Sequence, residues 1–383
     1  MKKIALITGS RADYGIMKHL IRKLYDDPEI DLKIIATAMH MEKKYGYTYK
    51  QIENDGFNIF KKITLNMTNS TDNQIIHEIA DLSIALSEIY ESEKFDLTLI
   101  LGDRYEMLAA ANTSVIYTVP ICHLHGGEKT LGNYDEFIRN AITKMSHLHL
   151  TSTESYRKRV IQMGELPQWV VDTGSLGVEN VLNEKQVTFE KLQQSVSLTN
   201  FQKKNYFVCL FHPTTLESPD ENKKVISNLL QLMSKYNCVF IGSNSDTGSD
   251  TIMNDIKIDV KSNSRHVLFD SLSTESFHCL VRNSNGLVGN SSSGIIEVPS
   301  LKVPTLNIGN RQSGRERGNS VIDVDGLNEY TLRNALNSMN EIRNFSNPYY
   351  KKDSANIAYK AIKKFLSNFK NIEKDFFDIK FNI

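Results

Sequence analysis

The stretch "DLTLILGDRYEMLAAANTSVIYTVPICHLHGG", residues 96–127, contains the pattern that decides the fold. Two short apolar runs, 96–103 and 119–127, flank a segment from Tyr105 to about Ser114 that we expect to be a helix. The apolar residues in both runs are continuous rather than alternating, which indicates strands that are covered on both faces. Two such strands with a helix between them predict a parallel β–α–β unit.

The same alternation of short apolar runs and longer amphipathic segments extends along almost the whole chain. It continues on both sides of 96–127 and restarts after a boundary somewhere within 174–205. The sequence therefore predicts an α/β protein with two doubly wound Rossmann-like domains that face a cleft. The further predicted strands are 3–9, 31–38, 146–153, 169–175, 206–215, 238–244, 266–271, 285–294 and 303–309.

The length of the chain also favours two domains, because 383 residues exceed what one ordinary hydrophobic core holds. We expect the first domain to span residues 1–174 and the second to span residues 175–362. A charged, helical tail of about 363–383 remains, and one place for it to pack is back on the first domain.

The composition is that of a globular protein, with 40% hydrophobic and 23% charged residues. Because 45 basic residues balance 45 acidic ones, no net field attracts nucleic acid or an anionic membrane. No apolar stretch is long enough to span a membrane, and the N-terminal run is too short for a signal peptide. The four cysteines form no C-x-x-C pair, so we expect them to be buried and reduced in a cytoplasmic protein.

Chemically unusual segments follow the predicted strands, where open parallel sheets bind their ligands. The segment "TGSRADYG" (8–15) is a small-residue turn into a helix, so its N–H groups and Arg11 can bind a phosphate or a sugar oxygen. The alternative is a tight turn with an exposed arginine. The segment lacks G-x-G-x-x-G, so it is no dinucleotide fingerprint.

The segment "NSSSGIIE" (290–297) places three hydroxyl groups, Ser291 to Ser293, at the start of a predicted helix. This arrangement suits a diphosphate, and Glu297 one turn later can accept hydrogen bonds from a ribose diol. The alternative is a serine N-cap with two spare serines. Arg311, Arg315 and Arg317 follow the next strand and reach the same edge.

Two weaker signals follow other strands of the second half. His212 ends one strand, where a lone histidine is either structural or part of a cleft. The polar loop "GSNSDTG" (242–248), which contains Asn244, suits sugar or base hydroxyl groups.

The most titratable segment is "ICHLHGGEKTLGNYDEFIRNAITK" (121–144). His123 and His125 are two residues apart, so on a strand both point to one face. Asp135 and Glu136 begin the next predicted helix, where a carboxylate favours the helix dipole even without a catalytic role. Asp103, after its own strand, is either a helix cap or a site residue. A metal site is a competitor that we do not favour, because hydroxyl groups and arginines can hold an anion without a cation.

Several motifs, in the same order and over essentially the whole chain, resemble the hydrolysing UDP-N-acetylglucosamine 2-epimerases. The likeness is to the bacterial enzymes that make N-acetylmannosamine for sialic-acid capsules. The motifs that carry it are "TGSRADYG", "MHMEKKYGYTY", "LGDRYE", "HGGEKTLGNYDEFIR", "GSLGVEN", "GSNSDTGSD" and "GNSSSGIIEVPSLKVPTLNIG".

The resemblance implies a glycosyltransferase-B fold that binds UDP in the cleft, mainly through the second domain. The implied roles are as follows: Ser291, Ser292 and Ser293 hold the diphosphate, Glu297 holds the ribose, and Arg11 and Arg311 neutralise the leaving group. His212 matches the family's active-site histidine, Asp103 its first catalytic carboxylate, and Asp135 or Glu136 its last. His40, Arg104, Asn244 and Gly294 lie in matching motifs and are further candidates for substrate binding.

One position departs from the family pattern. Many relatives carry a catalytic glutamate where this chain has His125, and Glu128 is a candidate to take over that role. Which group is the base and which the acid in this loop is therefore left open.

The implied reaction expels UDP from C1 of the sugar while the proton on C2 is removed, which gives 2-acetamidoglucal. Water then adds at C1, and a proton returns to the opposite face of C2, which gives N-acetylmannosamine. Two positioned acid/base groups are needed, but no metal or other cofactor. The resemblance also implies a homodimer or homotetramer.

Three alternatives remain open. The first is a related epimerase that acts on UDP-N,N'-diacetylbacillosamine in a legionaminic-type pathway. The second is a glycosyltransferase of the same fold, and the third is a catalytically silent UDP-sugar-binding protein. The acid-rich loop 121–144 argues against the second, because glycosyl transfer requires no proton removal from C2.

Overall fold

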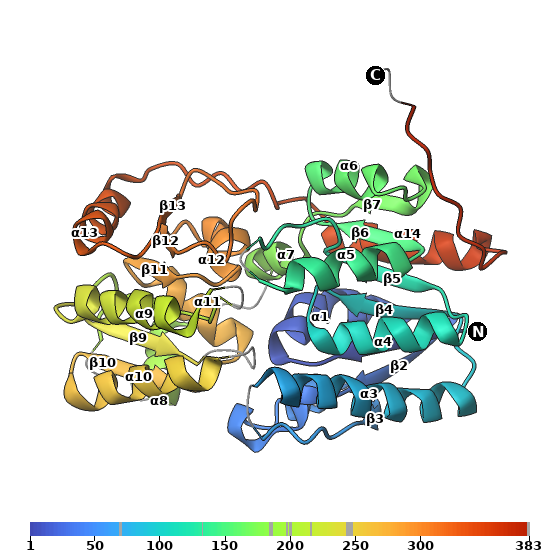
Figure 1. Cartoon of the computed structure of the whole chain (residues 1–383), viewed down its shortest axis with the longest axis horizontal. Coiled ribbons are helices and arrows are strands. Elements are labelled where there is room, and N and C mark those ends of the chain that lie inside the picture. Colours follow the sequence, from blue (N-terminus) through green and yellow to red (C-terminus); the bar gives the residue numbers. More distant parts are fainter. Residues whose placement is uncertain are drawn as a thin grey trace.

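A computed structural model of the chain describes residues 1–68, 71–131, 133–183, 187–196, 198, 201–214, 217–242 and 248–380. It contains two parallel sheets, each covered by helices on both faces, and the two resulting domains lie side by side (Figure 1). The predicted class, two doubly wound Rossmann-like domains, is therefore confirmed.

The first domain is built on a seven-stranded sheet in the order β3-β2-β1-β4-β5-β6-β7. Successive residues of β1 enter different cores: Ile4 and Leu6 pack on one face of the sheet, and Ala5 and Ile7 on the other. Burial on both faces explains why the strand is apolar without alternation. The strands are β1 (Lys2–Thr8), β2 (Ile30–Ala36), β3 (Ile59–Lys62), β4 (Leu97–Leu101), β5 (Ile121–Leu124), β6 (Leu148–Thr151) and β7 (Val170–Asp172).

Helices form a layer on each side of this sheet. One layer contains α1 (Arg11–Tyr25), α7 (Leu176–Asn183) and α14 (Ser354–Asn368). The other contains α3 (Asp72–Ser92), α4 (Tyr105–Ile116) and α5 (Asp135–Met145). The remaining helices of this domain are α2 (Tyr49–Asn54), α6 (Glu154–Gln162) and the 3-10 segments Ala38–Met41, Lys43–Tyr45 and Pro167–Trp169.

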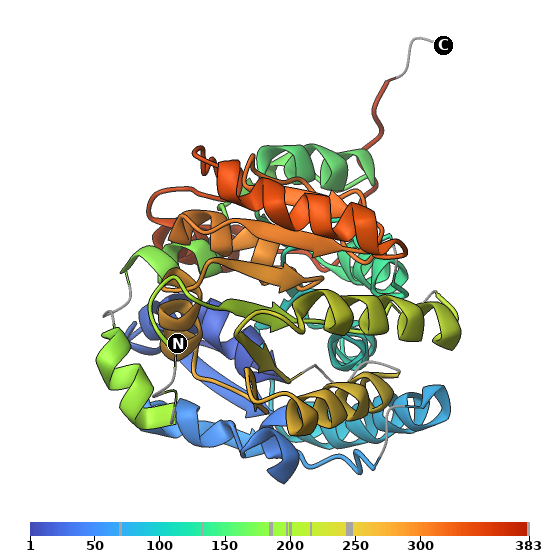
Figure 2. The ribbon, with the colours of Figure 1, turned by 90° about the vertical axis from the view of Figure 1, so that its left-hand side faces the viewer.

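The second domain has a six-stranded sheet in the order β10-β9-β8-β11-β12-β13, and Figure 2 shows helices on both sides of it. Its strands are β8 (Phe207–Leu210), β9 (Cys238–Ile241), β10 (His266–Phe269), β11 (Gly286–Gly289), β12 (Thr305–Ile308) and β13 (Val321–Val324). One face carries α8 (Phe189–Val196), α11 (Thr274–Arg282) and the 3-10 segment Val298–Leu301. The other carries α9 (Pro219–Met233), α10 (Ser249–Ser262), α13 (Glu329–Ser338) and the 3-10 segment Met339–Glu341.

Two strands lie outside the apolar runs that predict the others. Both β3 and β13 are at the edge of a sheet and keep several residues half-buried or exposed. An edge strand needs less apolar sequence than a central one, so the pattern is weak there.

The strand order reverses once in each sheet, between β1 and β4 in the first and between β8 and β11 in the second. Next to such a reversal the connections leave toward opposite sides, which opens a crevice at the carboxyl ends of the strands. The segment 8–15 follows β1, and the serines of 290–297 follow β11. The topology alone therefore places both at crevices.

The last part of the chain returns to the first domain. Ala358, Ile362 and Phe365 of α14 belong to the core under α1. After α14, the backbone N–H of Phe377 donates to the carbonyl of Gly164 over 2.8 Å. The predicted tail of about 363–383 is thus part of a longer returning segment, and we propose that the second domain ends before Ser354.

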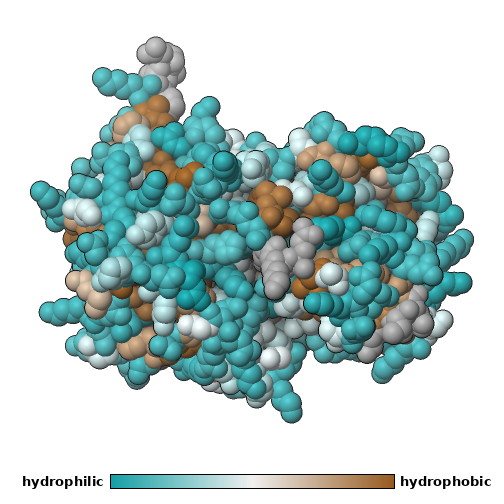
Figure 3. All heavy atoms as spheres, turned by 180° about the vertical axis from the view of Figure 1, so that it is seen from behind, coloured by the Kyte–Doolittle hydropathy of each residue, from teal (hydrophilic) through white to brown (hydrophobic). Residues whose placement is uncertain are grey.

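The surface, the cysteines and the lengths of the helices add three observations. Seen from behind, the molecule has two lobes with a mainly hydrophilic surface and scattered hydrophobic patches (Figure 3). All four cysteines are buried and unpaired.

In the part of the chain that the structure describes, no helix combines the length and the apolarity that a membrane crossing requires.

Candidate active site

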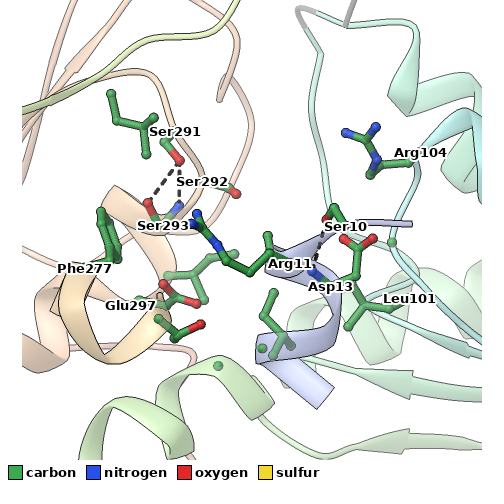
Figure 4. A pocket seen from close by; sticks show the side chains of 18 of the residues that line it. Ser10, Arg11, Asp13, Leu101, Arg104, Phe277, Ser291, Ser292, Ser293 and Glu297 are labelled. Carbon is green, nitrogen blue, oxygen red and sulfur yellow. Dashed lines mark hydrogen bonds between the residues drawn. The ribbon is translucent and has the colours of Figure 1, made fainter. Parts of the chain in front are cut away.

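A cavity of about 310 Å³ lies between the two domains, within the size range of small-molecule sites. Its first wall comes from the segments that follow β1, β4 and β5, and its second wall from those that follow β8, β11 and β12. Figure 4 shows Ser10, Asp13 and Arg104 on one side, with Ser291 to Ser293 and Glu297 on the other.

Most of the predicted site residues line this one cavity, although they come from distant parts of the chain. They are Arg11, Asp103, Arg104, His125, Glu128, Asp135, His212, Ser291, Ser292, Ser293, Glu297 and Arg311.

Three predicted residues lie elsewhere, held by burial, by hydrogen bonds or by close packing on the sheet. His40 is fully buried, and its ring nitrogens contact the hydroxyl groups of Thr8 (3.0 Å) and Thr48 (2.8 Å). Burial lowers the pKa of His40 to about 3, so the ring is neutral and joins β1 to the segment before α2. The carboxylate of Glu136 accepts a hydrogen bond from the backbone N–H of Thr130 over 2.7 Å and does not line the cavity.

Gly294 is buried behind the serines rather than at the cavity surface. A Cβ atom there would lie 2.8 Å from the Cγ2 of Thr305 and 3.0 Å from the Cδ2 of Leu287, so glycine permits close packing on the sheet. The fourth residue, Asn244, lies outside the described residues.

The second wall offers donors to an anion. The hydroxyl groups of Ser291 and Ser293 contact each other over 3.0 Å, and Ser292 precedes the short helix α12 (Ser293–Ile296) without a side-chain capping bond. The helix predicted for 295–301 is only one α turn followed by a 3-10 segment, so its dipole is small. Hydroxyl groups, rather than a long helix, therefore supply the local polarity.

Arginines complete the anion-binding surface. Burial lowers the pKa of Arg11 to about 10, and its buried Nη1 has no hydrogen-bond partner among the described residues. The buried Arg311 lines the cavity next to the serines, and its Nη1 donates to the carbonyl of Asn290 over 3.4 Å. The guanidinium group of Arg11 is buried and has an unused donor among the described residues, which favours binding of an anionic ligand.

Asn290 also fixes His212 at the cavity. Its side-chain oxygen accepts from the backbone N–H of His212 over 2.7 Å, and its amide nitrogen donates to the carbonyl of the same residue over 2.8 Å. These two bonds connect the loops after β8 and β11, so His212 and the serines keep a fixed relative position.

The first wall contains the carboxylates. Asp103 contacts Nη2 of Arg139 and accepts from the hydroxyl group of Thr130 over 3.4 Å. The buried Asp135 accepts from the side-chain amide of Asn133 over 3.1 Å. Burial alone would raise the pKa of Glu128, but the charge of Arg315 and the contacts with His125 and Ser152 lower it to about 2.

Two residues of this wall, Asp13 and Arg139, are missing from the sequence-based set. Asp13 follows Arg11 in the first turn of α1, and Arg139 follows Asp135 by four residues on α5, so both face the cavity with residues that were predicted. The helical spacing of Asp135 and Arg139 is a signal that a pattern search can use.

Asp13 provides a pH-dependent prediction. Burial raises the pKa of Asp13 from 3.8 to about 6, opposed by the charge of Arg104 and assisted by that of Glu106. Because its pKa is higher in the folded state, the protonated carboxyl group of Asp13 stabilises the fold below about pH 4. This stabilisation is lost as the pH rises through 6. The shift of about two units corresponds to about 3 kcal/mol at pH 8. Asp13→Asn should therefore raise the melting temperature more at pH 8 than at pH 5, and an equal change at both would contradict the assignment.

In the part of the chain that the structure describes, no three His, Cys, Asp or Glu side chains are arranged to hold a metal ion.

Comparison with known proteins gives consistent matches. A family model described as UDP-N-acetylglucosamine 2-epimerase matches residues 22–363. The chain is 42% identical to the polysialic acid biosynthesis protein P7 of Escherichia coli, over 99% of this chain and 98% of that protein. It is 34% identical to a hydrolysing UDP-N,N'-diacetylbacillosamine 2-epimerase of Legionella pneumophila, over 95% and 96% of the two chains.

Among solved structures, a UDP-GlcNAc 2-epimerase from Neisseria meningitidis, bound to UDP-GlcNAc, has the same fold. The TM-score is 0.79 at 18% identity, over 95% of this chain and all 100% of that one.

Proposed function

The chain belongs to the UDP-N-acetylglucosamine 2-epimerase family, and on that premise we propose that it is a hydrolysing member that converts UDP-N-acetylglucosamine to N-acetylmannosamine and UDP. The product feeds sialic-acid synthesis, in keeping with the name of the E. coli relative. The observation that carries the proposal is the cavity itself, in which an anion-binding wall faces a wall of acid/base groups.

The second wall binds the nucleotide in this proposal. Ser291, Ser292 and Ser293 donate to the diphosphate, while Arg11 and Arg311 offset its charge as UDP departs. Glu297 accepts hydrogen bonds from the ribose, and His212, from the loop after β8, lines the same wall.

The first wall moves protons at C2 of the sugar. In the first step the C2–H bond breaks, its electron pair forms the C1=C2 double bond, and the C1–O pair leaves with UDP. In the second step water adds its oxygen to C1 and gives one of its protons to a basic group of the wall, while an acidic group of the wall delivers a proton to the other face of C2. Asp103, His125 and Asp135 supply the acid/base groups for these transfers. No metal or other cofactor takes part.

A second candidate substrate is UDP-N,N'-diacetylbacillosamine, which the Legionella relative's name favours. The two sugars differ at C4 and C6, away from the groups that the reaction uses. A glycosyltransferase activity or a silent UDP-sugar-binding protein fits less well, because neither requires so many acid/base groups in one cavity.

Turnover in deuterated water separates these functions. We expect NMR to detect free UDP and N-acetylmannosamine with deuterium at C2. The label is expected because the hydrogen that returns to C2 comes from groups that exchange with the solvent. Unlabelled N-acetylglucosamine would indicate simple hydrolysis. Turnover of UDP-N,N'-diacetylbacillosamine alone would select the second substrate, and turnover of neither would contradict the proposal.

We also propose that the protein forms a homodimer or homotetramer. Large hydrophobic side chains on α3, α4 and α5 are exposed, including Ile76, Ile116 and Phe137, and a second copy would cover them.

A further inference from the structure

A buried ion pair connects the two domains at the cavity. Nη1 of Arg315, in the loop after β12, lies 2.5 Å from Oε2 of Glu128, in the loop after β5. Glu128 is 1% exposed and Arg315 is 6% exposed. Burying both charges is unfavourable unless they remain paired, so the pair favours the closed arrangement of the domains.

The other carboxylate oxygen of Glu128 orients His125. Oε1 contacts Nδ1 of His125 over 3.1 Å and accepts from the hydroxyl group of Ser152 over 2.6 Å. An ionised carboxylate only accepts hydrogen bonds, so the ring proton belongs on Nδ1. The buried Nε2 of His125, which has no partner among the described residues, is then the proton acceptor of a ring that lines the cavity.

The backbone of His125 is held in a costly conformation. Its φ of +65° lies in the left-handed region, which side chains with a Cβ atom avoid. The N–H of His125 donates to the carbonyl of Leu150 over 2.9 Å, and Arg139 donates to its carbonyl over 3.1 Å. Strained backbone that is fixed from several sides is typical of functional positions.

Residues 309–318, here called the arginine loop, join this contact to the anion-binding wall. Gln312 donates to the carbonyl of Asn290 over 2.9 Å, directly before the serines. The same loop meets the first domain where the N–H of Leu131 donates to the carbonyl of Ser313 over 3.4 Å. At Gly314 (φ +78°), a Cβ atom would lie 2.8 Å from the side chain of Lys129. The arginine loop therefore contacts both walls.

We propose that Glu128 is a positioning residue rather than an acid/base residue: it keeps the ring proton of His125 on Nδ1 and leaves Nε2 as the proton acceptor, and Arg315 makes this arrangement depend on closure of the nucleotide-binding domain. This inference rests on the proposed function and extends it. Nucleotide held by Arg311 and the serines fixes the arginine loop, and the loop in turn fixes the first-domain base.

The proton follows a defined path. His125 accepts the C2 proton on Nε2 as the C1=C2 bond forms and the C1–O pair leaves with UDP. The resulting imidazolium is stabilised by the carboxylate at Nδ1, as in other histidine–carboxylate pairs. The charged and titratable groups that face this pair are His123, Asp103, Asp135, Arg139, Tyr156, Arg315 and Tyr349.

Two variants should shift the pH profile of kcat/KM in opposite directions. Glu128→Gln removes the negative charge beside the ring of His125. The limb of the kcat/KM profile that reports protonation of this ring should therefore shift to lower pH by about one unit. Arg315→Gln removes the positive charge that offsets the negative charge of Glu128, so the same limb should shift to higher pH. Both should lower kcat by about 100-fold, while KM changes by less than about threefold.

The controls separate positioning from folding. Arg315→Lys keeps the charge and should keep the limb near its wild-type position. Lys18→Gln alters a different contact between the domains, with Glu275, and should behave like wild type. Melting temperature and UDP binding report whether each variant is folded.

The outcomes are distinguishable. Equal losses of activity with superimposable pH profiles would overturn the positioning role and leave the proposed function intact. If the wild type produced no C2-deuterated product, the proposed function would fail, and the positioning role would fail with it.

Discussion

Asp103→Asn is expected to lower kcat by about 100- to 10,000-fold while UDP still binds. The carboxylate lines the cavity and contacts Arg139, so in the proposed function its charge lies close to the sugar. Asparagine has the same shape and can still accept from Thr130, but it can neither hold nor carry a proton. Arg139 keeps the carbonyl of His125 and the hydroxyl group of Thr130 as partners, so the wall should stay folded.

Turnover assays and calorimetric titration with UDP measure the two effects separately. Glu136→Gln is the matched control, because this carboxylate is outside the cavity and glutamine preserves its acceptor for Thr130. Its activity should stay within about twofold of wild type, as for most substitutions away from a site. If Asp103→Asn lost as much UDP affinity as Ser292→Ala, Asp103 would have a structural role instead.

Arg311→Ala is expected to weaken UDP binding by about 10- to 100-fold, since a hydrogen bond to a charged group contributes about 1.5–3 kcal/mol. Arg311 is buried beside the serines. After the substitution, a cationic side chain on the surface cannot easily take its place. Because the same charge offsets the departing diphosphate, kcat should fall as well.

Isothermal titration with UDP and steady-state kinetics measure this effect. Arg333→Ala, on the surface of the same domain, is the control, because its ion pair with Glu329 is half exposed and far from the serines in sequence. Unchanged UDP affinity in Arg311→Ala would remove Arg311 from the nucleotide site. An equal loss in both variants would point to a general destabilisation of the domain.

The strands and their parallel order were predictable because their signal is local. Central strands such as β1 and β4 are buried on both faces over most of their length, so nearly all of their buried residues are apolar. Parallel strands bring their carboxyl ends to one edge. The sequence alone therefore assigns the motifs at 8–15 and 290–297 to a common cleft.

The sequence by itself therefore determined the fold class, the position of the site and most of the residue types in it. Only the tertiary structure decided which polar side chains meet: Glu128 pairs with Arg315, 187 positions away, and the buried ring of His40 contacts Thr8 and Thr48. The physical reason is that hydrophobic periodicity reports which face of an element is buried, whereas an ion pair depends on how two separately folded domains approach each other. That approach buries Glu128 beside His125, and the charge of Arg315 and the contact with His125 lower the pKa of Glu128 to about 2 despite its burial.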